Sequence, residues 1–230
     1  MMKLRLAAIA TVVLLGASAT SQADETITRG HNLAVDASTD GRLVMNLAGG
    51  IWIVPLSGGE AARITTDLTS AYRPRWSPDA SQVAYTATAG DSNGIWLHDL
   101  ASSTTRRLSE GSYFDLHPAW HPSGERITFV SDRNDTGYDL WEVDVPTGLH
   151  WRLSNRTGDE TEPAWSADGR DLIYIHQEGD QWSLVVRRQG ESEEILVTGT
   201  DRLAGPSWRP DGSLVTFWRE SDTGTSPVSY

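Results

Sequence analysis

The chain has 230 residues, which is long enough for one domain with a sizeable buried core. Its formal net charge of −12 argues against nucleic-acid binding, and its 38% hydrophobic content argues against a polytopic membrane protein. The chain has no cysteine, which excludes disulfides, cysteine-ligated metals and thiol catalysis.

The first 23 residues have the pattern of a signal peptide. Lys3 and Arg5 precede the apolar run LAAIATVVLLGA, and small residues lead up to Ala23. The apolar run is shorter than the roughly 20 residues that a membrane-spanning helix needs. We therefore expect cleavage near Ala23, export to the periplasm or the medium, and no membrane span. An uncleaved anchor is the alternative, and residues 24–32 are expected to form a short extension.

One phrase recurs along the rest of the chain. It reads PRWSPDA, PAWHPSG, PAWSADG and PSWRPDG, and consecutive tryptophans in it are 43 to 45 residues apart. A weaker upstream copy, VDASTDG, has Ala37 in the place of the tryptophan. Self-similarity at this period indicates a repeat architecture. The repeated tryptophans are Trp76, Trp120, Trp165 and Trp208.

Each period contains the same succession of β-rich segments. The phrase is followed by a run such as QVAYTAT, a polar turn, a second run such as GIWLHDL, and a short segment such as RRLS. With the Pro-x-Trp segment counted as a strand, each period has four strands, as does one blade of a β-propeller. We therefore predict an all-β fold, a β-propeller of four-stranded antiparallel blades. The tryptophan should wedge between neighbouring blades, and the Pro-Asp-Gly turn should supply a residue with positive φ.

The predicted propeller covers residues 33–230 and begins about five blades. The last blade has only SPVSY where third and fourth strands are expected, which would leave unpaired edges. We therefore expect the N-terminal part of a six- or seven-bladed ring, with closing blades or a C-terminal catalytic domain missing from this chain. A five-bladed ring closed by residues 24–30 is the alternative. The blade boundaries are about 33–71, 72–115, 116–160, 161–203 and an incomplete 204–230.

The phrase Pro-x-Trp-Ser-Pro-Asp-Gly, followed by a strand ending in SDRN at Ser131, resembles the TolB-like (WD40-like) propeller repeat. The resemblance covers about residues 31–230. Similar repeats occur in periplasmic TolB, in tricorn-type and prolyl-oligopeptidase-type peptidases, and ahead of some exported amidohydrolases. The resemblance implies an exported, non-catalytic module that binds a protein or peptide. The rival interpretation is a propeller that screens substrate for a following amidohydrolase or peptidase domain.

The residue before the motif proline begins the innermost strand of a propeller blade, so it should lie at the channel mouth. These residues differ chemically while the rest of the motif is uniform, which fits a binding site and also fits simple freedom from packing. Ligands commonly bind in such a funnel because several blades converge on it. The residues before the proline are Arg73, His117, Glu162 and Gly205, and the nearby Tyr72, Asp115 and Glu160 should lie beside them. The predicted binding residues are Tyr72, Arg73, Asp115, His117, Glu160 and Glu162.

Signals for catalysis or metal binding are weaker. His117 and His121 flank a Pro-Ala-Trp segment near Asp115, but on a strand and turn they do not project together as helical i, i+4 ligands do. The acidic phrase at residues 158–163 lacks the spacing of a calcium loop, and no Gly-x-Ser-x-Gly elbow occurs. We therefore predict no catalytic residue, no metal and no cofactor on this chain.

Overall fold

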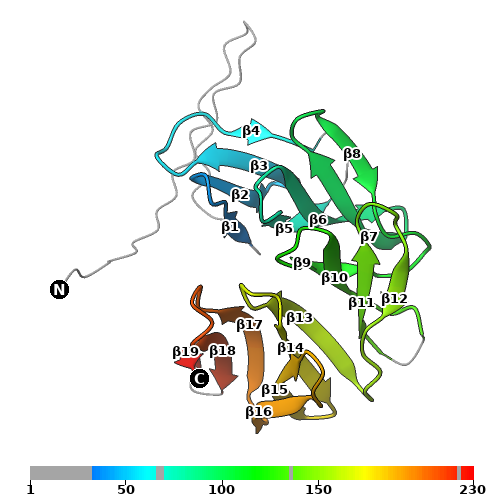
Figure 1. The fold of residues 1–230 in the computed structure, drawn as a ribbon, viewed down its shortest axis with the longest axis vertical. Helices are drawn as coiled ribbons and strands as arrows, with labels where there is room; N and C mark the ends of the chain where they lie inside the picture. Colours follow the sequence, from blue (N-terminus) through cyan, green and yellow to red (C-terminus); the bar gives the residue numbers. More distant parts are fainter. Residues whose placement is uncertain (1–32, 66–69, 135–136, 222–223) are drawn as a thin grey trace, which may run out of the picture.

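The computed structural model describes residues 33–65, 70–134, 137–221 and 224–230. In these ranges every regular element is a β-strand, and the 19 strands form five antiparallel sheets that follow one another around a central space (Figure 1). No helix in the described ranges has the length and apolar character to span a membrane. The predicted signal peptide and extension, residues 1–32, lie outside the described residues.

The strands of each sheet follow one another both in sequence and in space. The first sheet consists of β1 (Val35–Ala37), β2 (Arg42–Leu47), β3 (Gly50–Pro55) and β4 (Ala62–Arg63). The second consists of β5 (Ala71–Trp76), β6 (Gln82–Ala89), β7 (Ser92–Asp99) and β8 (Thr104–Arg107). The third consists of β9 (Leu116–Trp120), β10 (Arg126–Ser131), β11 (Asp139–Asp144) and β12 (His150–Arg152). The fourth consists of β13 (Asp159–Trp165), β14 (Asp171–Glu178), β15 (Gln181–Arg188) and β16 (Glu194–Gly199). The fifth has three strands, β17 (Arg202–Trp208), β18 (Val215–Ser221) and β19 (Gly224–Ser229). This confirms the predicted all-β propeller.

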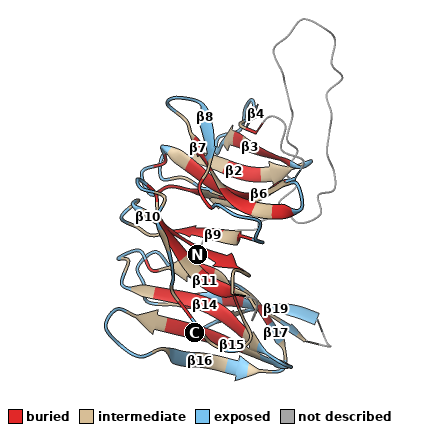
Figure 2. Ribbon diagram, turned by 90° about the vertical axis from the view of Figure 1, so that its right-hand side faces the viewer, coloured by how far each residue is buried: buried red, intermediate tan, exposed pale blue. Residues whose placement is uncertain are grey.

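The hydrophobic core lies between neighbouring sheets. Ile95 and Leu97 of β7 belong to one buried cluster with Ile127 and Phe129 of β10, so they join the second sheet to the third. Figure 2 shows that buried residues concentrate in the middle strands. A sheet covered on both faces needs apolar side chains at successive positions, which explains why these strands read as nearly continuous apolar runs.

The repeated tryptophan joins adjacent sheets, as predicted. The indole N–H of Trp120 donates to the carbonyl of Arg75 at 3.2 Å, and that of Trp208 donates to the carbonyl of Ala164 at 3.2 Å. In each case the acceptor belongs to the preceding sheet. The buried indole N–H of Trp76, whose preceding sheet is the first one, has no hydrogen-bond partner in the described part of the chain.

The turn after each inner strand contains the predicted residue with positive φ. The value is 74° at Gly124 and 71° at Gly169, where a residue without a Cβ adopts it readily. Ala80 holds the same position in the second sheet at 57°. The repeat therefore keeps its turn geometry even where glycine is absent.

The fifth sheet differs from the other four. Its third strand, β19, begins at Gly224 and is longer than the predicted SPVSY segment. Pro227 is tolerated in β19 because an outer-edge strand does not need every N–H. In Figure 1 the five sheets form an arc with the first and fifth sheets at its ends. Completion of the ring by further blades stays a prediction.

Candidate functional site in the central channel

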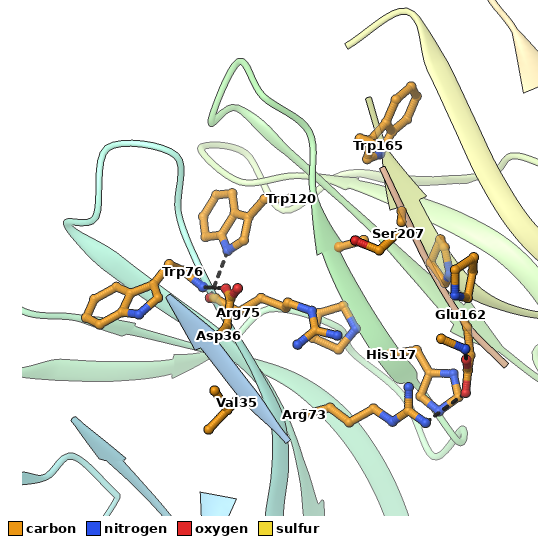
Figure 3. A pocket seen from close by; sticks show the side chains of 16 residues that line it. Val35, Asp36, Arg73, Arg75, Trp76, His117, Trp120, Glu162, Trp165 and Ser207 are labelled. Carbon is orange, nitrogen blue, oxygen red and sulfur yellow. Dashed lines mark hydrogen bonds and ion pairs between the residues drawn. The ribbon is translucent and has the colours of Figure 1, made fainter. Parts of the chain in front are cut away.

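The inner strands of all five sheets line one cavity of about 390 Å³ (Figure 3). In four sheets the residue before the motif proline faces this cavity. Three of these residues carry polar side chains, because the second, third and fourth sheets place an arginine, a histidine and a glutamate there. The four residues are Arg73, His117, Glu162 and Gly205.

These four residues share a left-handed backbone. The φ angle is 52° at Arg73, 54° at His117, 54° at Glu162 and 61° at Gly205. The pairing register of β5 with β6 and of β13 with β14 shifts at this position, which is the mark of a β-bulge. Non-glycine residues in this conformation are strained by about 1–3 kcal/mol each. Glycine would adopt this backbone without strain, yet three of the four positions carry polar side chains, which makes them candidates for a functional role.

Glu162 connects three sheets across the channel. One carboxylate oxygen lies 2.8 Å from a guanidinium nitrogen of Arg73, and the other accepts a hydrogen bond from the backbone N–H of Gly205. Arg73 and Glu162 come from the second and fourth sheets and are 89 residues apart in sequence. The Glu162 side chain is only 11% exposed, so water screens this ion pair less than a surface pair.

His117 lies beside this ion pair and is neutral at pH 7. Burial, and then the positive charge of Arg73, lower the pKa of His117 to about 4, although Glu162 opposes the shift. Burial tends to raise the pKa of Glu162, but Arg73 and the N–H of Gly205 outweigh it and hold that pKa below its ordinary value. The buried Nδ1 of His117 has no partner among the described residues. The cavity therefore brings together a carboxylate, a guanidinium and a neutral imidazole.

A second level of the channel lies two residues further along the inner strands. Arg75 is its one large cation, and its guanidinium donates to the carbonyl of Pro74 at 3.1 Å. Arg75 is the middle residue of its Pro-x-Trp motif, and this middle residue differs between sheets. That variability could have identified the second level from the sequence. The residues of this level are Asp36, Arg75, Ala119, Ala164 and Ser207.

Asp115 does not line the channel, contrary to the prediction from sequence. It is fully buried, and its carboxylate lies 2.9 Å from a guanidinium nitrogen of Arg133. The Arg133 guanidinium in turn lies over the rings of Tyr113, Phe129 and Trp141 at 4.9 to 5.5 Å. Asp115 therefore belongs to the structural contacts of the third sheet.

Glu160 and Tyr72 are also absent from the cavity lining. Glu160 is fully buried and accepts hydrogen bonds from the hydroxyl of Ser154 and from the N–H of Arg156 at 3.1 Å. In a regular strand, residues two apart share a face, so Glu160 should point with Glu162. The bulge at Glu162 breaks this alternation, which is why the prediction for Glu160 was wrong.

His121 lies apart from His117, at the turn that ends the inner strand. One ring nitrogen lies 2.9 Å from the hydroxyl of Ser123, and the ring packs edge-on against Trp165 at 4.7 Å. In the described ranges, no group of three or more histidine and acidic side chains is arranged to hold a metal ion. His121 therefore has a packing role in the turn.

Comparison with known proteins places the chain in a family. A family model of the TolB beta propeller domain matches residues 44–228. The chain belongs to the TolB β-propeller family. This TolB-family chain is 24% identical to a TolB-type protein from Agrobacterium tumefaciens, with a TM-score of 0.72 over 81% of this chain and 69% of that one. The likeness shows the fold.

Other propellers of known structure extend the comparison. TolB from Acinetobacter baumannii is 23% identical, with a TM-score of 0.72 over 86% of this chain, which spans about half (51%) of that protein. The tricorn protease is 14% identical, with a TM-score of 0.56 over 84% of this chain and 20% of the protease. TolB proteins and a protease share this fold, so function has to be argued from the site.

Proposed function

We propose that this TolB-family propeller is an exported, non-catalytic module that binds an extended segment of a protein or peptide at its channel mouth. The observation that carries the proposal is the set of three strained polar residues, Arg73, His117 and Glu162, that converge on one cavity. Strain of this kind is usually retained where a site needs a side chain in a particular direction. Export is expected from the leader in residues 1–23.

The size and chemistry of the cavity favour a narrow ligand. Its volume of about 390 Å³ lies in the range of clefts that bind small molecules or single peptide segments, and is too small for a folded domain. Ligands in such clefts are oriented by a few polar groups. Here the guanidinium of Arg75 is available to a ligand, whereas Arg73 and Glu162 already bind each other and the unpartnered Nδ1 atom of His117 is buried.

A substrate-screening propeller of a longer amidohydrolase or peptidase is the second candidate. It is favoured by the likeness of this chain to the tricorn protease and to a puromycin hydrolase, of which it covers only 20% and 31%. The reading frame downstream of Tyr230 separates the two functions. A continuing frame with a His-x-His motif or a serine nucleophile would support the hydrolase.

The direct test is binding to an array of random decapeptides. Ser207 is exposed, lines the cavity and has a small side chain, so Ser207→Trp should plug the channel without disturbing the core. Ser226→Trp, on the exposed strand β19 of the same sheet and outside the cavity lining, is the matched control. We expect Ser207→Trp to weaken binding of the array peptides at least tenfold and Ser226→Trp to leave it unchanged. Equal binding by both variants, or no peptide bound by the wild type, would contradict the proposal.

Export is tested separately. Expression of the full chain in a Gram-negative host should give a periplasmic product whose intact mass corresponds to cleavage near Ala23. A product that retains residues 1–23 would instead indicate an uncleaved anchor.

A further inference from the structure

We propose that Arg75 recognises a carboxylate on the segment that enters the channel. The carboxylate would belong either to an aspartate or glutamate side chain or to the end of a peptide chain. This inference rests on the proposed function and adds to it the chemistry of the ligand. It makes Arg75 the specificity-determining residue of the channel.

The charge of Arg75 has no counter-ion in direct contact. Its guanidinium donates to the carbonyl of Pro74 on its own strand, at 3.1 Å. Among the described residues, no carboxylate oxygen lies within 4.0 Å of its guanidinium nitrogens. The other arginine of the cavity, Arg73, is paired with Glu162. A guanidinium has five N–H donors, so Arg75 keeps most of its donors for a ligand.

Neither of the two acidic side chains of the cavity contacts the Arg75 guanidinium, although both carboxylates are close enough to stabilise its charge. Asp36 accepts the backbone N–H of Trp76 at 2.8 Å, and Glu162 holds both Arg73 and the N–H of Gly205. A guanidinium partly removed from water gains from a carboxylate, which it can bind through two parallel hydrogen bonds.

The neighbouring sheets leave room for that carboxylate. At the level of Arg75 they carry Ala119, Ala164 and Ser207, three small side chains. Figure 3 shows the Arg75 side chain reaching from its strand into the middle of the cavity. The strand at Arg75 is itself held in place, because the Arg75 carbonyl accepts the indole N–H of Trp120 from the next sheet. A preorganised strand lowers the entropic cost of binding.

The experiment compares three synthetic forms of the strongest array peptide. The first keeps its aspartates and glutamates and has an amidated C-terminus. The second replaces these residues by asparagine and glutamine and is also amidated. The third has the neutral sequence with a free C-terminal carboxylate. Dissociation constants are measured by fluorescence anisotropy with the full chain and with Arg75→Gln, Arg75→Lys and Arg170→Gln.

We expect the wild type to bind the first or the third form at least tenfold more tightly than the second, and the preferred form identifies the source of the carboxylate. Arg75→Gln should bind all three forms alike, and Arg75→Lys should keep part of the preference because it keeps the charge. Arg170 is exposed and lies outside the channel, so Arg170→Gln should keep the whole preference.

Two results would overturn the inference. One is a wild type that binds the peptide without preferring a carboxylate form, and the other is a preference that survives in Arg75→Gln. Either result leaves the proposed function intact if Ser207→Trp still weakens binding at least tenfold. Binding that Ser207→Trp does not affect, or the absence of any bound peptide, refutes the proposed function and the inference together. Circular dichroism and thermal unfolding of each variant confirm that it is folded.

Discussion

Two glutamates on strand β13, only two residues apart, lie in opposite environments. Glu160 is fully buried between the third and fourth sheets, and burial raises its pKa. Glu162 lies in the channel, where Arg73 and the N–H of Gly205 overcome the effect of burial and lower its pKa. Asp115, just before β9, and His117 on β9 are likewise placed apart, because Asp115 is fully buried against Arg133 whereas His117 lines the cavity. Buried polar residues away from the channel therefore stabilise the fold, whereas those in the channel form the proposed binding site.

The largest effect on the free energy of unfolding is expected at the buried ion pair of Asp115 and Arg133. Arg133→Met leaves the fully buried carboxylate of Asp115 without its counter-ion, which should cost about 3–5 kcal/mol of the free energy of unfolding. Urea denaturation measures the loss, and Arg170→Met, at an exposed pair, should cost less than about 1 kcal/mol. The Asp115→Asn/Arg133→Met double variant should recover part of the stability. A loss in Arg133→Met no larger than in Arg170→Met would show that this ion pair is not structural.

A smaller, pH-dependent effect is expected in the channel. Unfolded His117 binds a proton below its ordinary pKa of 6.5, whereas folded His117 does so only below about 4. Above pH 6.5 His117 is neutral in both states, so its burial does not make stability depend on pH. Between pH 6.5 and 4 only the unfolded state binds the proton, so the free energy of unfolding falls as the pH is lowered. Between pH 7.5 and 4.5 the wild type should lose about 2–3 kcal/mol more than His117→Gln. Urea denaturation of both proteins at the two pH values provides the measurement. Equal losses in the wild type and in His117→Gln would show that folding does not lower the pKa of His117.

Substitution of two repeated tryptophans, Trp120 and Trp76, tests the contribution of one hydrogen bond between sheets. Trp120→Phe removes the bond to the carbonyl of Arg75, whereas Trp76→Phe removes an indole N–H that has no partner among the described residues. The two changes remove the same volume from buried sites. Trp120→Phe should therefore be about 1 kcal/mol more destabilising in thermal or urea unfolding. The reverse order would mean that volume, not the hydrogen bond, decides the cost.

The smallest effect contrasts the two glutamates directly. The folded pKa of Glu160 lies above the ordinary 4.5, so this residue makes stability fall as the pH rises above 4.5. The folded pKa of Glu162 lies below 4.5, so this residue makes stability fall as the pH drops below 4.5. Glu160→Gln should therefore steepen the rise of stability with pH above 4.5, and Glu162→Gln should flatten it below 4.5. Urea unfolding from pH 3.5 to 6.5 tests both, and changes of the same sign would contradict the assignment of environments.

The sequence by itself determined the repeat, the all-β class, the place of most strands and the wedging tryptophans. These features follow from local rules, since the spacing of Trp76, Trp120, Trp165 and Trp208 sets the period and the apolar runs between them mark the strands. The sequence also indicated Arg73, His117 and Glu162 as channel residues, because their position before the motif proline repeats.

Only the tertiary structure decided which of the other polar residues reach the channel. Strand alternation predicts that Asp115 and Glu160 point with His117 and Glu162, but the left-handed backbone before each motif proline turns them away from the channel. The bond between Arg73 and Glu162 joins residues 89 apart, and no local pattern pairs them. Contacts between sheets depend on how the sheets fan around the axis, and a one-dimensional pattern does not carry that information.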